Sequence, residues 1–233
     1  MKAFLLAAGL GTRLRPLTGT VPKCMLPITG KPLLAIWLDA FARVGVDEVL
    51  VNLHYLPDVV TEYLAGRAEP PVVRTVFEPE LLGSAGTLLS NRAWVEDEGF
   101  FLACYADNLT DFELSRLVNA HLAYGGPATL TLFRAENPRS VGIVEMDNEA
   151  RVVAFIEKPE DPTGNLANAG MYAFSPSVLD EIEGLPPVDI GYGLLPKLVG
   201  KARGLVLDCY LRDIGTIESY NQAQVDWARK ASR

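Results

Sequence analysis

The first 38 residues carry five cationic side chains and no carboxylate, although the whole chain has 21 Lys+Arg, 29 Asp+Glu and a formal net charge of −8. Arg13 and Lys23 belong to this group and follow the glycine-containing segment LAAGLGT (residues 6–12). Glycine lets the backbone approach a ligand closely, and successive backbone N–H groups form a nest that binds anions. A forked guanidinium and a compact ammonium beside such a loop suit a polyphosphate. The pattern therefore predicts a phosphate-binding loop.

Two better-known phosphate-binding motifs do not fit this segment. A dinucleotide fingerprint requires a third glycine where Leu14 stands, and an acidic residue about 20 positions further on, whereas the first carboxylate is Asp39 inside a predicted helix. A Walker A loop requires Gly-Lys-Ser/Thr, but Gly30-Lys31 is followed by Pro32. The remaining alternative is a surface turn with scattered cations.

Two aspartates stand at positions that suit a hard metal ion. Asp107 follows the apolar run FFLACYA (residues 100–106), and Asp213 lies just before a predicted helix over 217–230, for which Thr216 is a candidate N-cap. Mg²⁺ takes oxygen ligands and usually only one or two protein carboxylates. Taken singly, each aspartate also fits a role as a turn or cap former.

Composition excludes several classes of protein. An acidic chain of 233 residues lacks the broad basic face that nonspecific nucleic-acid binding requires, so no nucleic-acid partner is expected. Three distant cysteines argue against a disulfide framework, and two histidines are too few for a zinc site. No apolar run approaches the ~20 residues that cross a bilayer, so no membrane partner is expected. Gly9 and Gly11 interrupt the N-terminal apolar stretch too early for a signal peptide, which predicts a cytoplasmic protein.

The elements expected to position these residues alternate between strands and helices. Apolar runs at 3–8, 48–53, 72–77 and 100–105 predict strands that are mostly buried on both faces, and helical spacing recurs at 33–44, 57–66, 84–94 and 113–124. This alternation predicts an α/β fold with a doubly wound, mostly parallel sheet, whose ligands lie beyond the carboxyl ends of the strands.

From residue 128 the spacing leaves no room for helices. The runs 129–133, 142–147 and 151–158 predict an inserted antiparallel β segment with a hairpin turn at 147–150, followed by a strand at 169–174 and a helix near 176–184. We expect a single domain over 1–233, divided near residue 125.

The segment LAAGLGTRLRP (residues 6–16), continued by Pro22-Lys23 and by GKPL (residues 30–33), resembles the signature of the sugar-1-phosphate nucleotidyltransferases. The resemblance extends through five further blocks over almost the whole chain. Within the family, the chain resembles the short, single-domain members, such as the mannose- and heptose-1-phosphate guanylyltransferases. It implies a Rossmann-like, GT-A-like fold, with residues 1–125 binding the nucleotide and 126–233 the sugar phosphate. It also implies an enzyme that joins a nucleoside triphosphate to a sugar 1-phosphate with release of pyrophosphate, for the synthesis of nucleotide sugars such as those used in cell-surface polysaccharides.

The resemblance also implies a set of site residues. Arg13 and Lys23 would act on the triphosphate, Asp107 and Asp213 would hold Mg²⁺, and Lys158 would bind the phosphate of the sugar 1-phosphate. The implied nucleotide-binding residues are Leu6, Ala7, Gly9, Gly11, Thr12, Glu78 and Gly83. The implied sugar-binding residues are Gly142, Glu157, Asn168 and Gly170. For the last four, a structural role in strands and turns is the alternative.

Glu78 bears on the nucleobase. Relatives that use thymidine triphosphate carry a glutamine at its place, and an ionised carboxylate only accepts hydrogen bonds. It therefore favours guanine, which offers two adjacent donors, and GTP; an exposed Glu78 without a ligand is the alternative. Cys24 departs from the family pattern, in which proline or glutamine follows the lysine of this loop. We interpret Cys24 as a small apolar filler, with a reactive thiol as the alternative.

Three functions other than guanylyl transfer remain as alternatives. One is uridylyl or thymidylyl transfer to a sugar 1-phosphate. Another is a catalytically silent subunit that binds nucleotide sugar, although such a subunit would be expected to lose the loop arginine or a metal aspartate, both of which are present here. The third is nucleotidyl transfer to phosphocholine or a similar non-sugar phosphate. The sequence leaves the sugar and the oligomeric state open, a homo-oligomer included.

Overall fold

In the computed structural model, which describes residues 1–231, the chain divides into two compact units. Unit 1 comprises Met1–Lys2, Leu81–Cys104 and Glu113–Asp208. Unit 2 comprises Ala3–Glu80, Tyr105–Phe112 and the chain from Cys209 onward. Both units are therefore built from separate stretches of sequence. The expected single domain, divided near residue 125, stays a prediction.

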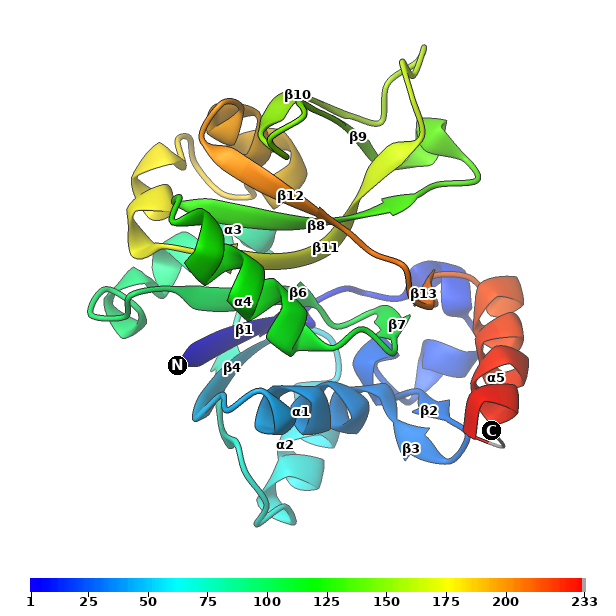
Figure 1. Ribbon diagram of the computed structural model, residues 1–233. Helices are drawn as coiled ribbons and strands as arrows, with labels where there is room; N and C mark the ends of the chain where they lie inside the picture. Colours follow the sequence, from blue (N-terminus) through cyan, green and yellow to red (C-terminus); the bar gives the residue numbers. More distant parts are fainter. Residues whose placement is uncertain (232–233) are drawn as a thin grey trace. The chain divides into compact units, whose positions relative to one another are not determined.

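Unit 2 contains three consecutive strands in the order β1 (Lys2–Leu6), β4 (Glu48–Leu53) and β5 (Val72–Phe77), with β4 and β5 parallel (Figure 1). The connections contain the helices α1 (Leu33–Arg43) and α2 (Pro57–Ala65), as βαβ units require. Helix α1 buries its apolar face, including Leu34, Leu38 and Phe41 at helical spacing. It ends before Gly45, whose φ of +78° suits a helix C-terminus.

Four short strands and a long helix also belong to unit 2. Strands β2 (Pro27–Ile28) and β3 (Lys31–Pro32) form a short hairpin, and β7 (Asn108–Thr110) pairs antiparallel with β13 (Leu211–Asp213). Helix α5 (Ile217–Ala231) follows, and Gln224 on it bonds to the β2–β3 hairpin at Pro27, where β2 begins, and at Thr29, in the turn. The hydroxyl of Thr216 accepts a hydrogen bond from Ser219 N–H at 3.1 Å, which confirms Thr216 as the N-cap.

Unit 1 holds the remaining strands. Its strands lie in the order β10 (Val152–Glu157), β9 (Gly142–Met146), β11 (Leu166–Phe174) and β6 (Phe101–Tyr105), all in antiparallel pairs. Strand β8 (Ala128–Arg134) pairs antiparallel with β11 and parallel with β12 (Ala202–Val206). Helix α4 (Leu114–Tyr124) packs against β8, β11 and β12, and α3 (Ser84–Ser90) against the turn at 190–194 (Figure 1).

The structure corrects several expected elements. The first strand ends at Leu6 rather than at residue 8, the helix predicted over 84–94 stops at Ser90 before a 3₁₀ turn, and the helix near 176–184 is a 3₁₀ turn over Pro176–Glu181. The expectation of burial on both faces is wrong for β5, where Val72 is 63% and Phe77 56% exposed. Among the described residues, β5 lies at the end of the strand order and pairs only with β4. Its apolar run therefore reflects strand propensity and not burial.

The predicted α/β class, with helices between parallel strands and an antiparallel β segment, is confirmed. The hairpin turn at 147–150 is also confirmed, because Ala150 N–H bonds to the carbonyl of Asp147 at 3.1 Å. Antiparallel pairing reaches beyond the expected insertion, since β11 pairs antiparallel with both β6 and β8. No helix within residues 1–231 is long and apolar enough to span a membrane.

Candidate functional site

The predicted phosphate-binding loop leaves β1 at Leu6 and offers backbone N–H groups. Gly11 has a φ of +61°, a left-handed conformation that glycine adopts without strain, and its carbonyl is held by the hydroxyl of Thr18 at 2.8 Å. Within residues 1–231, the N–H groups of Gly9, Leu10, Gly11 and Thr12 make no hydrogen bond with the chain. The loop therefore has donors available for an anion.

Asn52, which the sequence analysis missed, holds the start of this loop. Its side-chain carbonyl accepts the N–H of Ala7 at 2.7 Å, and its amide donates to Oε1 of Glu78 at 2.9 Å. Glu78 is only 2% exposed, so the alternative of an exposed Glu78 is wrong. The signal in the sequence was a lone asparagine in the apolar strand EVLVNL. The contact of Glu78 with a nucleobase stays a prediction.

Lys23 lies between the two candidate metal ligands. Its ammonium is 2.7 Å from Oδ2 of Asp107 and 3.1 Å from Oδ1 of Asp213. The lysine side chain is 10% exposed, whereas the carboxylates are 40% and 56% exposed. A largely buried cation is thus neutralised by two carboxylates that face solvent.

Backbone hydrogen bonds fix this arrangement within unit 2. The N–H of Ala106 donates to the carbonyl of Leu6 at 3.0 Å, and the N–H of Ile214 donates to the carbonyl of Asp107 at 3.1 Å. The indole N–H of Trp37 on α1 donates to the carbonyl of Asn108 at 2.9 Å. The end of β1, the 105–108 segment and β13 are thereby tied together.

Arg13 joins the same group of residues. A Cβ placed on Gly215 would lie 3.2 Å from a guanidinium nitrogen of Arg13 and 2.9 Å from Oδ1 of Asp213, so both side chains lie against this glycine. Arg13 is exposed, and within the described residues its side chain makes no ion pair. Its charge is therefore available to a ligand.

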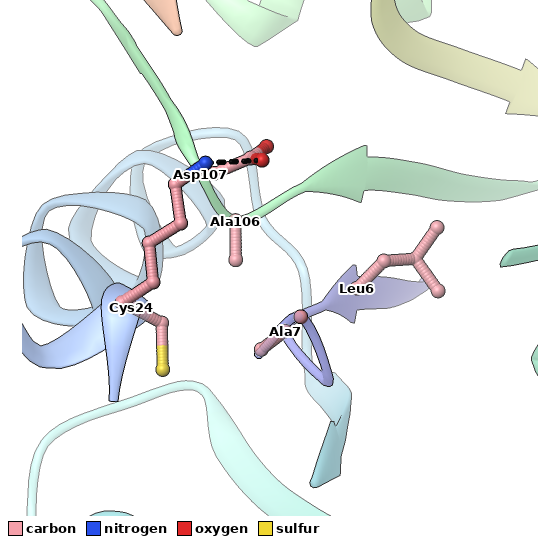
Figure 2. Close-up of a pocket in the computed structure, with 7 residues that line it drawn as sticks. Leu6, Ala7, Cys24, Ala106 and Asp107 are labelled. Atoms are coloured by element: carbon pink, nitrogen blue, oxygen red, sulfur yellow. Dashed lines mark hydrogen bonds and ion pairs between the residues drawn. The ribbon is translucent and has the colours of Figure 1, made fainter. Parts of the chain in front are cut away.

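Lys23, Asp107 and part of the first loop line a pocket whose close-up is Figure 2, where a dashed line marks the Lys23–Asp107 ion pair. Its lining residues are Leu6, Ala7, Gly9, Lys23, Cys24, Ala106 and Asp107. Cys24 is 2% exposed, and burial raises the pKa of its thiol to about 12. Because the thiolate is the nucleophilic form, this supports a filler rather than a reactive thiol.

The donor set fits a Mg²⁺ ion. Asp107 and Asp213 present hard carboxylate oxygens and converge on one positive charge, the ammonium of Lys23. Among the described residues, no group of three or more His, Cys, Asp or Glu side chains could hold a metal. A site with two carboxylates matches Mg²⁺, which commonly keeps several waters and takes further oxygens from substrate phosphates.

The predicted sugar-binding residues lie on the adjacent strands β10, β9 and β11 of unit 1. Glu157 stands directly opposite Gly142 in the β10–β9 pair, and a Cβ on Gly142 would lie 2.5 Å from Oε2 of Glu157. Burial raises the pKa of Glu157, the charge of Lys158 lowers it and that of Asp189 raises it. Glu157 is thus a half-buried acceptor that the absent side chain of Gly142 accommodates.

Asn168 and Gly170 lie at an irregularity of β11, where the β11–β8 register shifts between Asn168 and Tyr172. Gly170 has a φ of +74° and donates its N–H to Oδ1 of Asn168 at 3.1 Å. The amide of Asn168 donates to the hydroxyl of fully buried Tyr172 at 2.7 Å. Bulges often re-aim side chains beside active sites, and Tyr172 is a second residue that the sequence analysis missed.

Lys158 has a φ of +48°, an uncommon conformation for a residue with a side chain. It is exposed, and within the described residues its ammonium makes no ion pair or hydrogen bond. Strained backbone of this kind clusters at functional sites.

Gly83 has a structural role that its sequence position did not indicate. With a φ of +75°, it lies so close to Val188 that an added Cβ would be 2.5 Å from the Val188 carbonyl oxygen.

Thr12 begins the 3₁₀ turn that carries Arg13. The structure therefore brings together the first loop, Lys23, Asp107 and Asp213 in unit 2, and Gly142, Glu157, Asn168 and Gly170 in unit 1. Their roles in binding stay predictions.

The sequence matches a known family over nearly all of its length. Residues 2–230 match the profile of the nucleotidyl transferase family. The chain is 36% identical over 229 residues to mannose-1-phosphate guanylyltransferase 1 of Arabidopsis thaliana, which covers 94% of this chain and 63% of the relative. It is 36% identical over 232 residues to mannose-1-phosphate guanylyltransferase of Mycobacterium tuberculosis, and this match covers 97% of this chain and 64% of the relative. The chain thus spans less than two thirds of these relatives.

Solved structures share the fold. A UDP-glucose pyrophosphorylase complexed with UDP-glucose superimposes with a TM-score of 0.85 at 22% identity, over 98% of both chains. HddC from Yersinia pseudotuberculosis, complexed with GMP-PN, gives a TM-score of 0.80 at 24% identity, over 97% of this chain and 99% of the other.

Proposed function

The chain belongs to the nucleotidyl transferase family, and from this premise we propose that it transfers a guanylyl group from GTP to a sugar 1-phosphate, with release of pyrophosphate. Mannose 1-phosphate is the first candidate acceptor, because the two relatives at 36% identity are mannose-1-phosphate guanylyltransferases. The arrangement of Lys23, Asp107 and Asp213 beside a loop with available N–H donors carries the proposal. That arrangement suits a bound triphosphate.

In the proposed reaction, an oxygen of the sugar 1-phosphate attacks the α-phosphorus of GTP in line with the departing pyrophosphate. A phosphate monoester is largely ionised near neutral pH, so no general base is needed. The obstacle is repulsion between two anions, which positioning and charge neutralisation overcome. Arg13 and Lys23 stabilise the triphosphate and the developing pyrophosphate, and Lys158 orients the attacking phosphate.

Asp107 and Asp213 would hold Mg²⁺, which when bound would supply positive charge to the phosphate oxygens. Lys23 donates to both carboxylates here, which uses two of the three N–H donors of its ammonium and leaves one for a phosphate. Glu157 and Asn168 would accept and donate hydrogen bonds to sugar hydroxyls, with Gly142 and Gly170 allowing close approach of the ring. Glu78, Gly83 and the loop residues Leu6, Ala7, Gly9, Gly11 and Thr12 would contact the nucleotide.

Pyrophosphate release tests the proposal directly. The purified chain is incubated with Mg²⁺, each of GTP, ATP, UTP, CTP and dTTP, and a panel of sugar 1-phosphates that includes mannose, glucose and heptose. Phosphocholine serves as a non-sugar acceptor. We expect release to be fastest with GTP and mannose 1-phosphate. Omission of Mg²⁺, and addition of excess EDTA, should abolish it.

Each other result selects one alternative. A preference for UTP or dTTP would keep the enzyme class and exclude the guanylyl assignment. Release with phosphocholine alone would exclude sugar 1-phosphates as acceptors. Nucleotide binding without release from any pair would leave only a silent binding subunit.

A further inference from the structure

The segment that follows Gly83 is joined to a distant stretch of unit 1 by backbone hydrogen bonds. The N–H groups of Ala85 and Gly86 donate to the carbonyl of Val188 at 2.9 and 3.0 Å. In return, the N–H of Val188 donates to the carbonyl of Leu82 at 2.8 Å. The backbone can approach this closely because Gly83 has no Cβ. The start of α3 and the stretch at 188 therefore form one rigid unit of backbone.

Ser84 and Asp189 add a side-chain connection. Neither residue was predicted from the sequence as a site residue, and neither has a role in the proposed reaction. Oδ1 of Asp189 lies 3.1 Å from the N–H of Ser84 and 3.3 Å from its hydroxyl. The Ser84 hydroxyl also accepts the N–H of Ile190 at 2.8 Å. Each residue thereby holds the other, and Ser84 fixes the first residue of the π-helical turn Ile190–Leu194. We call this pair the Ser84–Asp189 clamp.

The next residue in that turn lies directly against the proposed sugar acceptor. A Cβ on Gly191 would be 2.5 Å from Oε2 and 2.9 Å from Cδ of Glu157. Gly142 approaches the same oxygen from the neighbouring strand, so two glycine backbones enclose one carboxylate. A half-buried carboxylate lowers its free energy when it turns toward water, so it keeps its orientation only while its surroundings stay in place.

We propose that the Ser84–Asp189 clamp positions Glu157 for the sugar 1-phosphate, by holding the backbone of Gly191 against the Glu157 carboxylate. Ser84 and Asp189 are then positioning residues, which act through Gly191 and need not touch the substrate themselves. This inference rests on the proposed function, in which Glu157 binds sugar hydroxyls. It assigns a sugar-side role to a serine in the segment that the sequence placed on the nucleotide side.

The test is a kinetic comparison of Ser84→Ala with the wild-type chain under the conditions that give turnover. Loss of the hydroxyl frees Ile190 N–H and one bond to Asp189, so the turn can move away from Glu157. We expect KM for the sugar 1-phosphate to rise on the order of 10-fold, the size of one lost hydrogen bond. KM for the nucleotide and kcat at saturation should stay within about 2-fold. Ser84→Thr, which keeps a hydroxyl, should restore most of the sugar affinity.

Two further variants make the test specific. Ser90→Ala removes an exposed serine from the other end of α3 and should leave both KM values unchanged. Asp189→Ala opens the clamp from the opposite side and provides a second test should Ser84→Ala fail to fold. We expect Asp189→Ala to raise KM for the sugar 1-phosphate as Ser84→Ala does. The double variant should be no worse than the more affected single variant, because both remove one connection.

The outcomes separate this inference from the proposed function. Wild-type turnover with unchanged sugar KM in both single variants would overturn the clamp alone. Equal rises in both KM values, or a fall in kcat without a change in KM, would indicate general loss of structure and also overturn it. Absence of wild-type turnover with every pair of substrates would overturn both the proposed function and the clamp.

Discussion

The ammonium of Lys23 lies 2.7 Å from Oδ2 of Asp107, although 84 positions separate the two residues in the sequence. Asp213, which is 190 positions from Lys23, completes the arrangement at 3.1 Å. Lys23, predicted to bind phosphate, and the two aspartates, predicted to bind a metal ion, therefore lie in contact with one another. The two carboxylates use two of the three N–H donors of the Lys23 ammonium, so the third can contact a phosphate while this arrangement is kept.

The first prediction concerns the charges at this point. Asp107→Asn and Arg13→Gln should each lower kcat on the order of 10²–10³-fold, since each group stabilises charge in the transition state. Steady-state pyrophosphate release, at saturating concentrations of both substrates, measures the effect. Asp161→Asn, at a position where the side chain is 99% exposed, is the matched control and should keep wild-type kcat. An unchanged kcat in either site variant would remove that residue from the mechanism.

The second prediction concerns the nucleobase. In Glu78→Gln, the amide oxygen still accepts the hydrogen bond from Asn52, so the loop should keep its position. The new amide also donates, which no longer matches two adjacent donors of guanine. We expect the ratio of kcat/KM for GTP to that for dTTP to fall on the order of 10-fold. A ratio equal to that of the wild type would mean that Glu78 only supports Asn52.

The third prediction is a pH dependence of stability. Burial raises the pKa of Glu157 above its ordinary value of 4.5, so the folded state holds this proton more tightly than the unfolded state. The ionised carboxylate therefore lowers the stability of the fold as pH rises above about 4.5. Glu157→Gln should raise Tm at pH 7 by about 2 °C, with no difference from the wild type below pH 4. Thermal unfolding across this pH range measures the effect.

The same variant should lose sugar affinity, because the carboxylate accepts hydrogen bonds at both oxygens whereas the amide accepts only at its one oxygen. Glu183→Gln is its control, since Lys197 lowers the pKa of that exposed glutamate and the sign of the effect is reversed. Equal Tm values for Glu157→Gln and the wild type at pH 7 would contradict the burial argument.

The fourth prediction distinguishes the three thiols. Cys24 is buried with its pKa raised to about 12, Cys104 is buried with a raised pKa, and Cys209 is partly exposed. Iodoacetamide at pH 8 should therefore label Cys209 in the native protein and all three thiols after unfolding in guanidinium. Peptide mass spectrometry identifies the labelled residue. Rapid labelling of Cys24 in the native protein would contradict this prediction and would support the alternative that Cys24 is a reactive thiol.

The sequence by itself determined the features that depend on neighbouring residues. The spacing of Leu34, Leu38 and Phe41 predicted α1, and Thr216 predicted the start of α5, because helix faces and caps are set within a few residues. The cationic loop and Asp107 were found in the same way, since each directly follows an apolar strand. The family resemblance supplied the further blocks, and the match over residues 2–230 confirms that resemblance.

Only the tertiary structure decided which distant residues meet. Nothing in the apolar run of β5 indicated that Val72 and Phe77 would face water, because strand propensity does not reveal a strand's place in the sheet order. Asn52 is linked to the first loop through its contacts with Ala7 and Glu78, and Ser84 is linked to the distant stretch beside Glu157 through Asp189. Such contacts join residues 26 to 105 positions apart, and packing of the whole unit, rather than local periodicity, sets their geometry.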